Sequence, residues 1–157
     1  MSTVELAARV LAKCQARGFT LGTAESLTGG LVCAALTDIP GSSAVVRGGV
    51  VSYATDIKAS VLRVDAELLA THGAVDPEVA RLMAEGAVRV LGVDLAVATT
   101  GVAGPDGQDG VEPGVVYLAV AGAITGHERH VFAGDRNDVR KASVLAALGL
   151  LDSLLDH

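Results

Sequence analysis

Two side chains in this sequence have the chemistry needed for nucleophilic hydrolysis, Ser26 and Lys58. Ser26 lies between a predicted strand and a predicted helix, beside two glycines, where its hydroxyl would be exposed near the helix N-terminus. Lys58, the only lysine between residues 14 and 140, could take the serine proton, because a lysine desolvated by apolar walls has a lowered pKa. From the residues alone, an N-cap serine and a solvated surface lysine remain open alternatives.

Histidine, the usual base for a serine nucleophile, has no convincing position in this chain. His72 precedes a helix-stopping glycine, His127 and His130 lie on the last predicted strand, and His157 is the terminal residue. A Ser-His-Asp triad is therefore not supported. No cluster of His, Cys and carboxylate residues has metal-ligand spacing, so we predict no metal.

Three loops contain more Gly, Ser and Thr than turns require, at residues 25–30, 41–43 and 101–107. Their glycines could turn backbone N–H groups toward a phosphate or a developing oxyanion at the carboxyl ends of strands. Each loop taken alone could equally be an ordinary tight turn. Arg136 and Arg140, one helical turn apart, form either an anion clamp for a phosphate or part of a surface network of ion pairs.

The elements that must position these residues alternate between helices and strands. Apolar periodicity, capping residues and glycine stops predict the order α-β-α-β-α-α-α-β-β-β-α. The first two strands are predicted over residues 19–24 and 45–53, and residues 95–100 form the apolar segment typical of a buried central strand. Residues 115–121 and 128–132 predict a hairpin. We therefore expect a three-layer α/β/α sandwich with a mixed, mainly parallel sheet.

Length and composition predict one domain over residues 1–157. A net charge of −6 has the wrong sign for a protein that neutralises a nucleic-acid backbone. The longest apolar run, residues 115–124, is about half of the roughly 20 residues that a membrane span needs, and the N-terminus has no signal-peptide pattern. Cys14 and Cys33 are isolated and are expected to be reduced, buried residues. We expect a cytoplasmic protein with no nucleic-acid or membrane partner.

Six motifs occur in an order that resembles one known family. They are Ala24-Glu25-Ser26-Leu27-Thr28-Gly29-Gly30, Pro40-Gly41-Ser42-Ser43, Gly49-Val50-Val51-Ser52-Tyr53 with Lys58, His72-Gly73-Ala74-Val75, Gly101-Val102-Ala103-Gly104-Pro105-Asp106-Gly107 and Gly134-Asp135-Arg136. Together they cover essentially the whole chain and look like the CinA C-terminal domain family, the nicotinamide mononucleotide deamidases. The resemblance implies an α/β/α sandwich, commonly a homodimer, that converts nicotinamide mononucleotide and water to nicotinate mononucleotide and ammonia in pyridine nucleotide salvage, without a metal or cofactor.

The resemblance also implies roles for single residues. Ser26 would be the nucleophile and Lys58 its general base, with Tyr53 assisting proton transfer or orientation. Amides from Thr28 to Gly30 would polarise the carboxamide oxygen, and water would open a covalent acyl-enzyme. The residues that would bind the nucleotide are Thr28, Gly29, Gly30, Ser42, Thr100, Gly101, Ala103, Arg136 and Arg140.

This chain departs from the family pattern in two places. Asp76 stands where many relatives have Ser, and it is still a competent helix cap. Residues 108–112 lack a lysine often seen in relatives, and if that lysine attracts phosphate, substrate affinity would be reduced. The chain leaves no room for the molybdopterin-binding-like domain of longer members, so their pyrophosphatase activity is not expected. The alternative is a non-catalytic nucleotide-binding or protein-interaction module of the same family; the presence of both Ser26 and Lys58 favours the enzyme.

Overall fold

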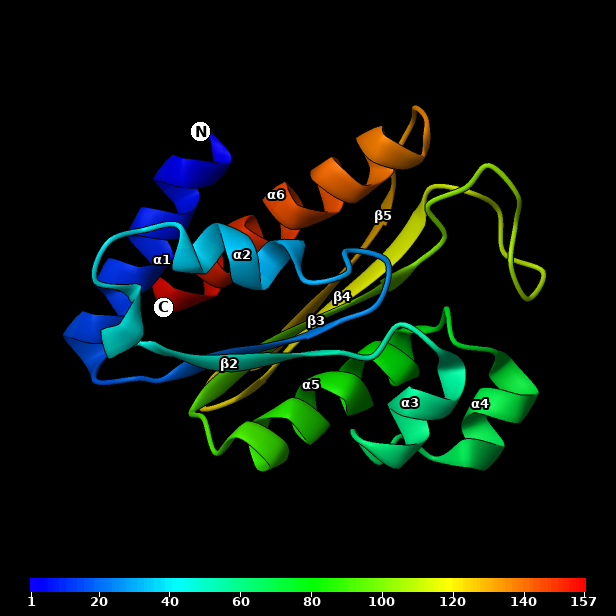
Figure 1. The fold of residues 1–157 in the computed structure, drawn as a ribbon, viewed down its shortest axis with the longest axis horizontal. Helices are drawn as coiled ribbons and strands as arrows, with labels where there is room; N and C mark the ends of the chain where they lie inside the picture. The colour runs from blue at the N-terminus through cyan, green and yellow to red at the C-terminus, as the bar shows by residue number, and fades with distance from the viewer.

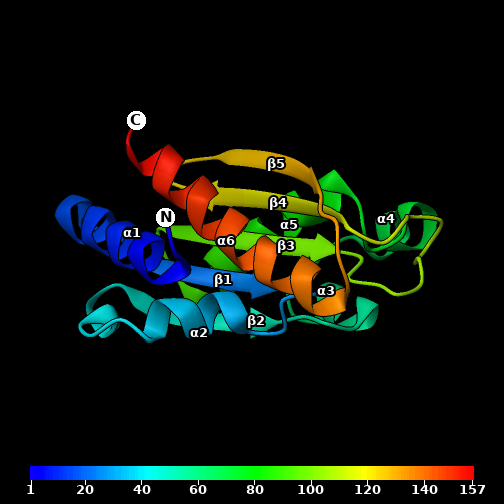
Figure 2. The same ribbon diagram turned by 90° about the horizontal axis from the view of Figure 1, so that it is seen from above.

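A five-stranded mixed sheet forms the centre of the computed structural model, which describes residues 1–157 (Figure 1). Its strand order is β2-β1-β3-β4-β5, as Figure 2 shows from above. The strands are β1 (Leu21–Glu25), β2 (Val46–Val51), β3 (Leu95–Gly101), β4 (Val115–Gly122) and β5 (Gly126–Val131). β1 pairs in parallel with β2 and β3, whereas β4 is antiparallel to β3 and β5. Four strands thus run in one direction, which confirms the prediction of a mixed, mainly parallel sheet.

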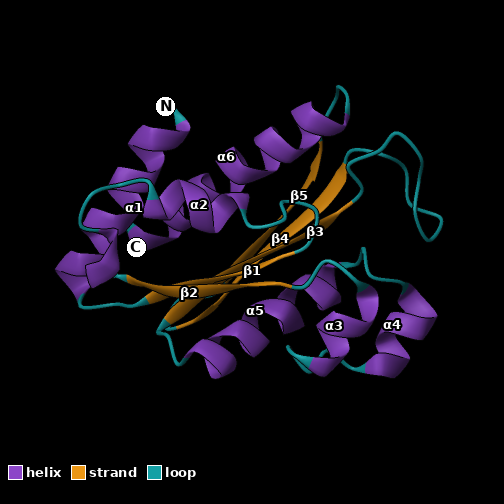
Figure 3. Ribbon diagram, viewed as in Figure 1, coloured by secondary structure: helices purple, strands orange, loops and turns teal.

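Helices cover both faces of the sheet, as Figures 2 and 3 show. One face carries α1 (Thr3–Arg17), α2 (Leu31–Thr37) and α6 (Arg136–Leu155), and the other carries α3 (Thr55–Ser60), α4 (Ala66–His72) and α5 (Pro77–Leu91). A short 3-10 helix, η1 (Ser42–Ala44), precedes β2. The predicted three layers and the predicted order of helices and strands are confirmed. No helix has the length and apolar character needed to cross a membrane.

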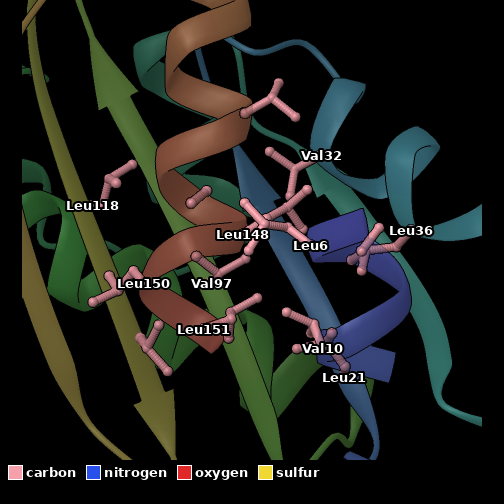
Figure 4. Packing of buried hydrophobic residues seen from close by; sticks show 14 of the residues in the cluster. Leu6, Val10, Leu21, Val32, Leu36, Val97, Leu118, Leu148, Leu150 and Leu151 are labelled. Carbon is pink, nitrogen blue, oxygen red and sulfur yellow. The ribbon is translucent and has the colours of Figure 1, made fainter. Parts of the chain in front are cut away.

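Two apolar clusters, one on each face, hold the layers together, because side chains on a strand alternate between the faces. On β3, Leu95 and Val97 belong to the first cluster and Ala96 and Ala98 to the second. Figure 4 shows the first cluster, which includes Leu6 and Val10 of α1, Val32 and Leu36 of α2, Leu148 and Leu151 of α6, and Leu21, Val97 and Leu118 of the sheet. The same alternation decides toward which face of the sheet each polar side chain at the ends of β1 and β3 points.

Polar caps begin the longer helices at the positions that the sequence predicts. The Asp76 carboxylate accepts hydrogen bonds from the N–H groups of Glu78 and Val79 at 2.8 and 3.3 Å, and Pro77 occupies the first turn of α5. Asp135 and Asp138 form a reciprocal capping box at the start of α6. Asp76 therefore serves as the helix cap that the sequence predicts.

The structure corrects the predicted ends of three strands. β1 begins at Leu21 rather than residue 19. The last strand begins at Gly126 rather than residue 128, because only three residues separate it from β4 and the pairing of Val120 with Gly126 extends the ladder. β2 ends at Val51 rather than residue 53. The chain turns there, so that the next two carbonyls become acceptors for a side chain of α3.

Candidate active site

The side chains of Ser26 and Lys58 are in direct contact at the carboxyl end of the sheet. Ser26 follows β1 directly, and Lys58 lies on α3, the short helix after β2. Lys58 Nζ lies 2.8 Å from Ser26 Oγ, and it also donates hydrogen bonds to the backbone oxygens of Ser52 at 2.7 Å and Tyr53 at 3.1 Å. Three contacts thus fix the amine beside the serine hydroxyl.

Lys58 is buried, with only 1% of its surface exposed, and Ser26 is 8% exposed. Burial disfavours the charged amine and lowers the pKa of Lys58 from 10.5 to about 8. Its three hydrogen-bond partners are a hydroxyl and two carbonyls, with no carboxylate among them to hold the charge. At pH 7 about a tenth of Lys58 is therefore the neutral base that a serine nucleophile requires, and the neutral fraction rises as the pH passes 8.

Hydrogen bonds from β3 and from α6 hold the turn that carries Ser26. The Ser26 N–H donates to the Thr99 carbonyl at 3.0 Å, which ties the turn to β3. Arg140 on α6 donates from Nε to the Leu27 carbonyl at 2.9 Å and from Nη2 to the Thr28 carbonyl at 3.4 Å. These hydrogen bonds hold the turn around the nucleophile to β3 and to α6.

A pocket of about 420 Å³ opens beside Ser26, a size typical of small-molecule sites. Its walls come from the turn after β1, the segment between β2 and α3, the loop after β3 and the start of α6. The lining residues are Ser26, Leu27, Tyr53, Ala54, Thr55, Gly101, Val102, Ala103, Gly104, Asp106, Gly107, Gln108 and Arg136. A larger hollow between α5 and the β4–β5 hairpin contains none of the predicted site residues.

Arg136 spans the pocket between two of its walls. Its Nη2 donates to the Tyr53 hydroxyl and its Nη1 to the Gly104 carbonyl, both at 3.0 Å. The partners are neutral, so the guanidinium charge is not neutralised by a carboxylate. Tyr53 is 58% exposed, and its hydroxyl hydrogen-bonds to Arg136 rather than to Ser26 or Lys58. Of the predicted site residues, the pocket therefore gathers Ser26 with Tyr53, Gly101, Ala103 and Arg136, and Lys58 lies behind the serine.

The glycines predicted to polarise a carboxamide already have other hydrogen-bond partners. The Gly29 N–H donates to the Ser26 carbonyl at 3.0 Å, and the Gly30 N–H donates to the Glu25 carboxylate at 3.2 Å. In contrast, the N–H groups of Leu27, Thr28 and Ala103 have no protein acceptor, and Leu27 and Ala103 line the pocket. The expectation is therefore corrected for the Gly29 and Gly30 amides.

Three other predicted binding residues lie outside the pocket. Thr100 points to the α5 face, following the alternation of β3, and donates to the Ala74 carbonyl at 2.7 Å. Ser42 lies in η1 before β2, at the opposite end of the sheet from Ser26. Arg140 does not line the pocket, because its guanidinium binds the carbonyls of the Ser26 turn.

Several residues of the site lie in segments that the sequence indicated, residues 25–30 and 101–112, but were given no individual role. Gly104, Asp106 and Gln108 line the pocket, and the fully buried Glu25 adjoins the nucleophile. The signal for Glu25 was a charged residue at the end of an apolar strand. No group of three His, Cys, Asp or Glu side chains converges in the manner of a metal site.

The fold and the site together define a class of α/β/α domain in which a serine after the first strand contacts a lysine buried on a short helix. Residues 3–155 match the CinA C-terminal domain. The chain belongs to this family.

Similar proteins support the same assignment. The CinA-like protein of Frankia casuarinae is 47% identical over 140 residues, which cover 88% of this chain and 32% of that protein. The chain thus spans about a third of the length of this curated relative. The crystal structure of the competence damage-inducible protein A (ComA) from Klebsiella pneumoniae superposes with a TM-score of 0.96 at 40% identity, covering 100% of this chain and 99% of the other. The competence/damage inducible protein CihA from Agrobacterium tumefaciens gives 0.93 at 39% identity, with full coverage of both chains.

Proposed function

We propose that the chain is a nicotinamide-nucleotide amidohydrolase, which converts nicotinamide mononucleotide and water to nicotinate mononucleotide and ammonia. The observation that carries the proposal is the 2.8 Å contact between Ser26 Oγ and the buried Lys58 Nζ. A lysine with a lowered pKa is a known activator of a serine nucleophile in acyl transfer. The carboxamide of the nucleotide is the acyl group that such a pair would attack.

The hydrogen bonds of Lys58 direct its lone pair toward Ser26. A neutral amine has two N–H donors and one lone pair. The Ser52 and Tyr53 carbonyls can only accept, so they take the two donors. The lone pair then faces the third neighbour, Ser26 Oγ. Deprotonated Lys58 is therefore oriented to accept the proton of the serine hydroxyl.

The reaction then follows two acyl-transfer steps. Ser26 Oγ attacks the carboxamide carbon while its proton passes to Lys58, and the resulting oxyanion is stabilised by the free N–H groups of Leu27 and Ala103. The C–N bond breaks as Lys58 returns the proton to the leaving nitrogen, so ammonia departs and an ester to Ser26 remains. Water, deprotonated by Lys58, attacks this ester; the C–O bond to Ser26 breaks as Lys58 returns the proton to Ser26 Oγ, and nicotinate mononucleotide is released.

Arg136 supplies the charge that would recognise the phosphate. Its guanidinium lies at the pocket mouth with only the Tyr53 hydroxyl and the Gly104 carbonyl as partners. A phosphate presents charged acceptors that compete well against such neutral ones. In this role Tyr53 positions Arg136, rather than assisting proton transfer at Ser26.

The test is ammonia release by the purified protein from nicotinamide mononucleotide, nicotinamide riboside and nicotinamide. We expect turnover to be highest with the mononucleotide and to be abolished in Ser26→Ala, which retains nucleotide binding. Ser60→Ala, which removes an exposed hydroxyl at the end of α3, is the matched control and should retain full turnover. Nucleotide binding by the wild type without ammonia release would instead indicate the non-catalytic binding module.

A further inference from the structure

The carboxylate of Glu25 has no exposed surface, yet it makes five hydrogen bonds. Oε1 accepts from Thr28 Oγ1 at 2.7 Å, from Val32 N at 2.8 Å and from Gly30 N at 3.2 Å, and Oε2 accepts from Cys33 N at 3.0 Å and Thr23 Oγ1 at 3.1 Å. Three of these donors are backbone N–H groups at the start of α2, which have no acceptor within the helix. Glu25 therefore joins the end of β1 to the start of α2, on either side of the nucleophile.

A second branch of this network leads from Glu25 to Ser26. Thr28 donates its single hydroxyl proton to Glu25. In its contact with Thr99, the Thr28 hydroxyl oxygen can therefore only accept a hydrogen bond. Thr99 Oγ1, at 2.8 Å, must then donate to Thr28. This leaves a lone pair of Thr99 Oγ1 for the N–H of Ser26 at 3.3 Å, as a second acceptor beside the Thr99 carbonyl at 3.0 Å. The carboxylate thus fixes the direction of every hydrogen bond in a chain that ends on the nucleophile's own amide.

We propose that Glu25 is a positioning residue for Ser26 and acts on it through Thr28 and Thr99. The proposal rests on the function proposed above, in which Ser26 is the nucleophile. A nucleophile must lie within a narrow range of distance and angle from both its base and the carbon that it attacks, and small displacements reduce the rate strongly. The chain of hydrogen bonds restrains the Ser26 backbone at its N–H, whereas Lys58 contacts the Ser26 side chain.

Two substitutions separate this role from simple helix capping. Thr99→Val keeps the side-chain shape and removes only the hydroxyl, so the caps on Val32 and Cys33 stay intact. Glu25→Gln keeps the size but replaces one acceptor oxygen with an N–H₂ donor, so one helix N–H loses its acceptor. The matched control is Thr20→Val, because the Thr20 hydroxyl contacts a carboxylate, Asp94, at the opposite end of β1 at 3.1 Å.

The experiment measures two rates on each full-length variant, at equal folded fraction. One is kcat and KM for nicotinamide mononucleotide, and the other is the rate of Ser26 labelling by a fluorophosphonate, mapped by mass spectrometry. We expect Thr99→Val to lower kcat and labelling about 3–10-fold, and Glu25→Gln about 10–100-fold, with KM changed less than about twofold. Thr20→Val should change neither rate.

The outcomes distinguish this proposal from the proposed function. Labelling that falls as expected, in a protein that releases no ammonia, supports the positioning role and overturns the substrate. Wild-type rates of labelling and turnover in Thr99→Val overturn the positioning role, even if Glu25→Gln fails to fold. A lower melting temperature with unchanged rates assigns the network to stability alone, and a wild-type Ser26 that does not react with the probe overturns both proposals.

Discussion

Replacing Lys58 with Met tests the burial on which the proposed base depends. The folded chain holds the pKa of Lys58 near 8, whereas the unfolded chain restores it to 10.5. The protonation of Lys58 therefore lowers the free energy of unfolding by about 3 kcal/mol at pH 7, since each pKa unit corresponds to about 1.36 kcal/mol. Met has a similar shape and no charge, so Lys58→Met removes this contribution. It also leaves the carbonyls of Ser52 and Tyr53 without a donor, which is a loss that does not vary with pH.

The sign of the pH dependence follows from proton binding. Between pH 8 and 10.5 the unfolded state binds more protons at this lysine than the folded state, so the wild-type free energy of unfolding rises with pH through that window. The rise begins just below pH 8 and amounts to about 1 kcal/mol between pH 7 and 9. Urea unfolding at pH 7, 8 and 9 should therefore show wild type gaining about 1 kcal/mol relative to Lys58→Met.

Lys141→Met is the control for this measurement, because it removes an exposed lysine from α6. The difference in free energy of unfolding between the wild type and Lys141→Met should not change with pH in this way. A wild-type minus Lys58→Met difference that stays constant from pH 7 to 9 would refute the reasoning, because it would show that the buried amine has no lowered pKa.

Four further predictions concern catalysis and packing. The value of kcat/KM should rise about tenfold from pH 7 to 9 as Lys58 loses its proton, and a flat pH profile would count against Lys58 as the base. Arg136→Ala should raise KM for nicotinamide mononucleotide about 10–100-fold while changing KM for nicotinamide riboside less than about threefold, as measured by initial rates. Arg140→Ala should lower kcat about tenfold with little change in KM, because it frees the Ser26 turn; a rise in KM alone would restore its role as a phosphate clamp. Gly101→Ala should cost about 1–3 kcal/mol in urea unfolding, since the added methyl would lie 2.7 Å from the Val115 carbonyl oxygen, and an unchanged midpoint would contradict this.

The order of helices and strands could be predicted because the sequence patterns that indicate them are local. Apolar runs, helix caps and stop glycines act within a few residues, so the order of elements and the buried central strand β3 follow from short windows of sequence. The ends of strands depend on the partner strand, which explains the errors at β2 and β5. The extent of the β4–β5 ladder is set by cross-strand pairing, and a window on one strand does not contain that information.

The candidate site was predicted only in part, because contacts between distant residues decide it. Ser26 and Lys58 are 32 positions apart, and nothing within α3 shows that its lysine is buried. Only the resemblance to the CinA family indicated that these two residues act together. It did not show that Arg140 binds the Ser26 turn, because a guanidinium that contacts carbonyls and one that contacts phosphate have the same local sequence.

Glu25 shows why residue type can mislead at such a site. A glutamate is rarely fully buried, so sequence reasoning assigns it to solvent by default. Here alternation along β1 directs the side chain to the α2 face, where unpaired helix N–H groups and two threonine hydroxyls compensate its burial. An unpaired buried charge would cost too much to persist, so its presence requires this set of donors. The donors in turn fix the turn between β1 and α2, and the same arrangement that makes Glu25 tolerable therefore restrains Ser26.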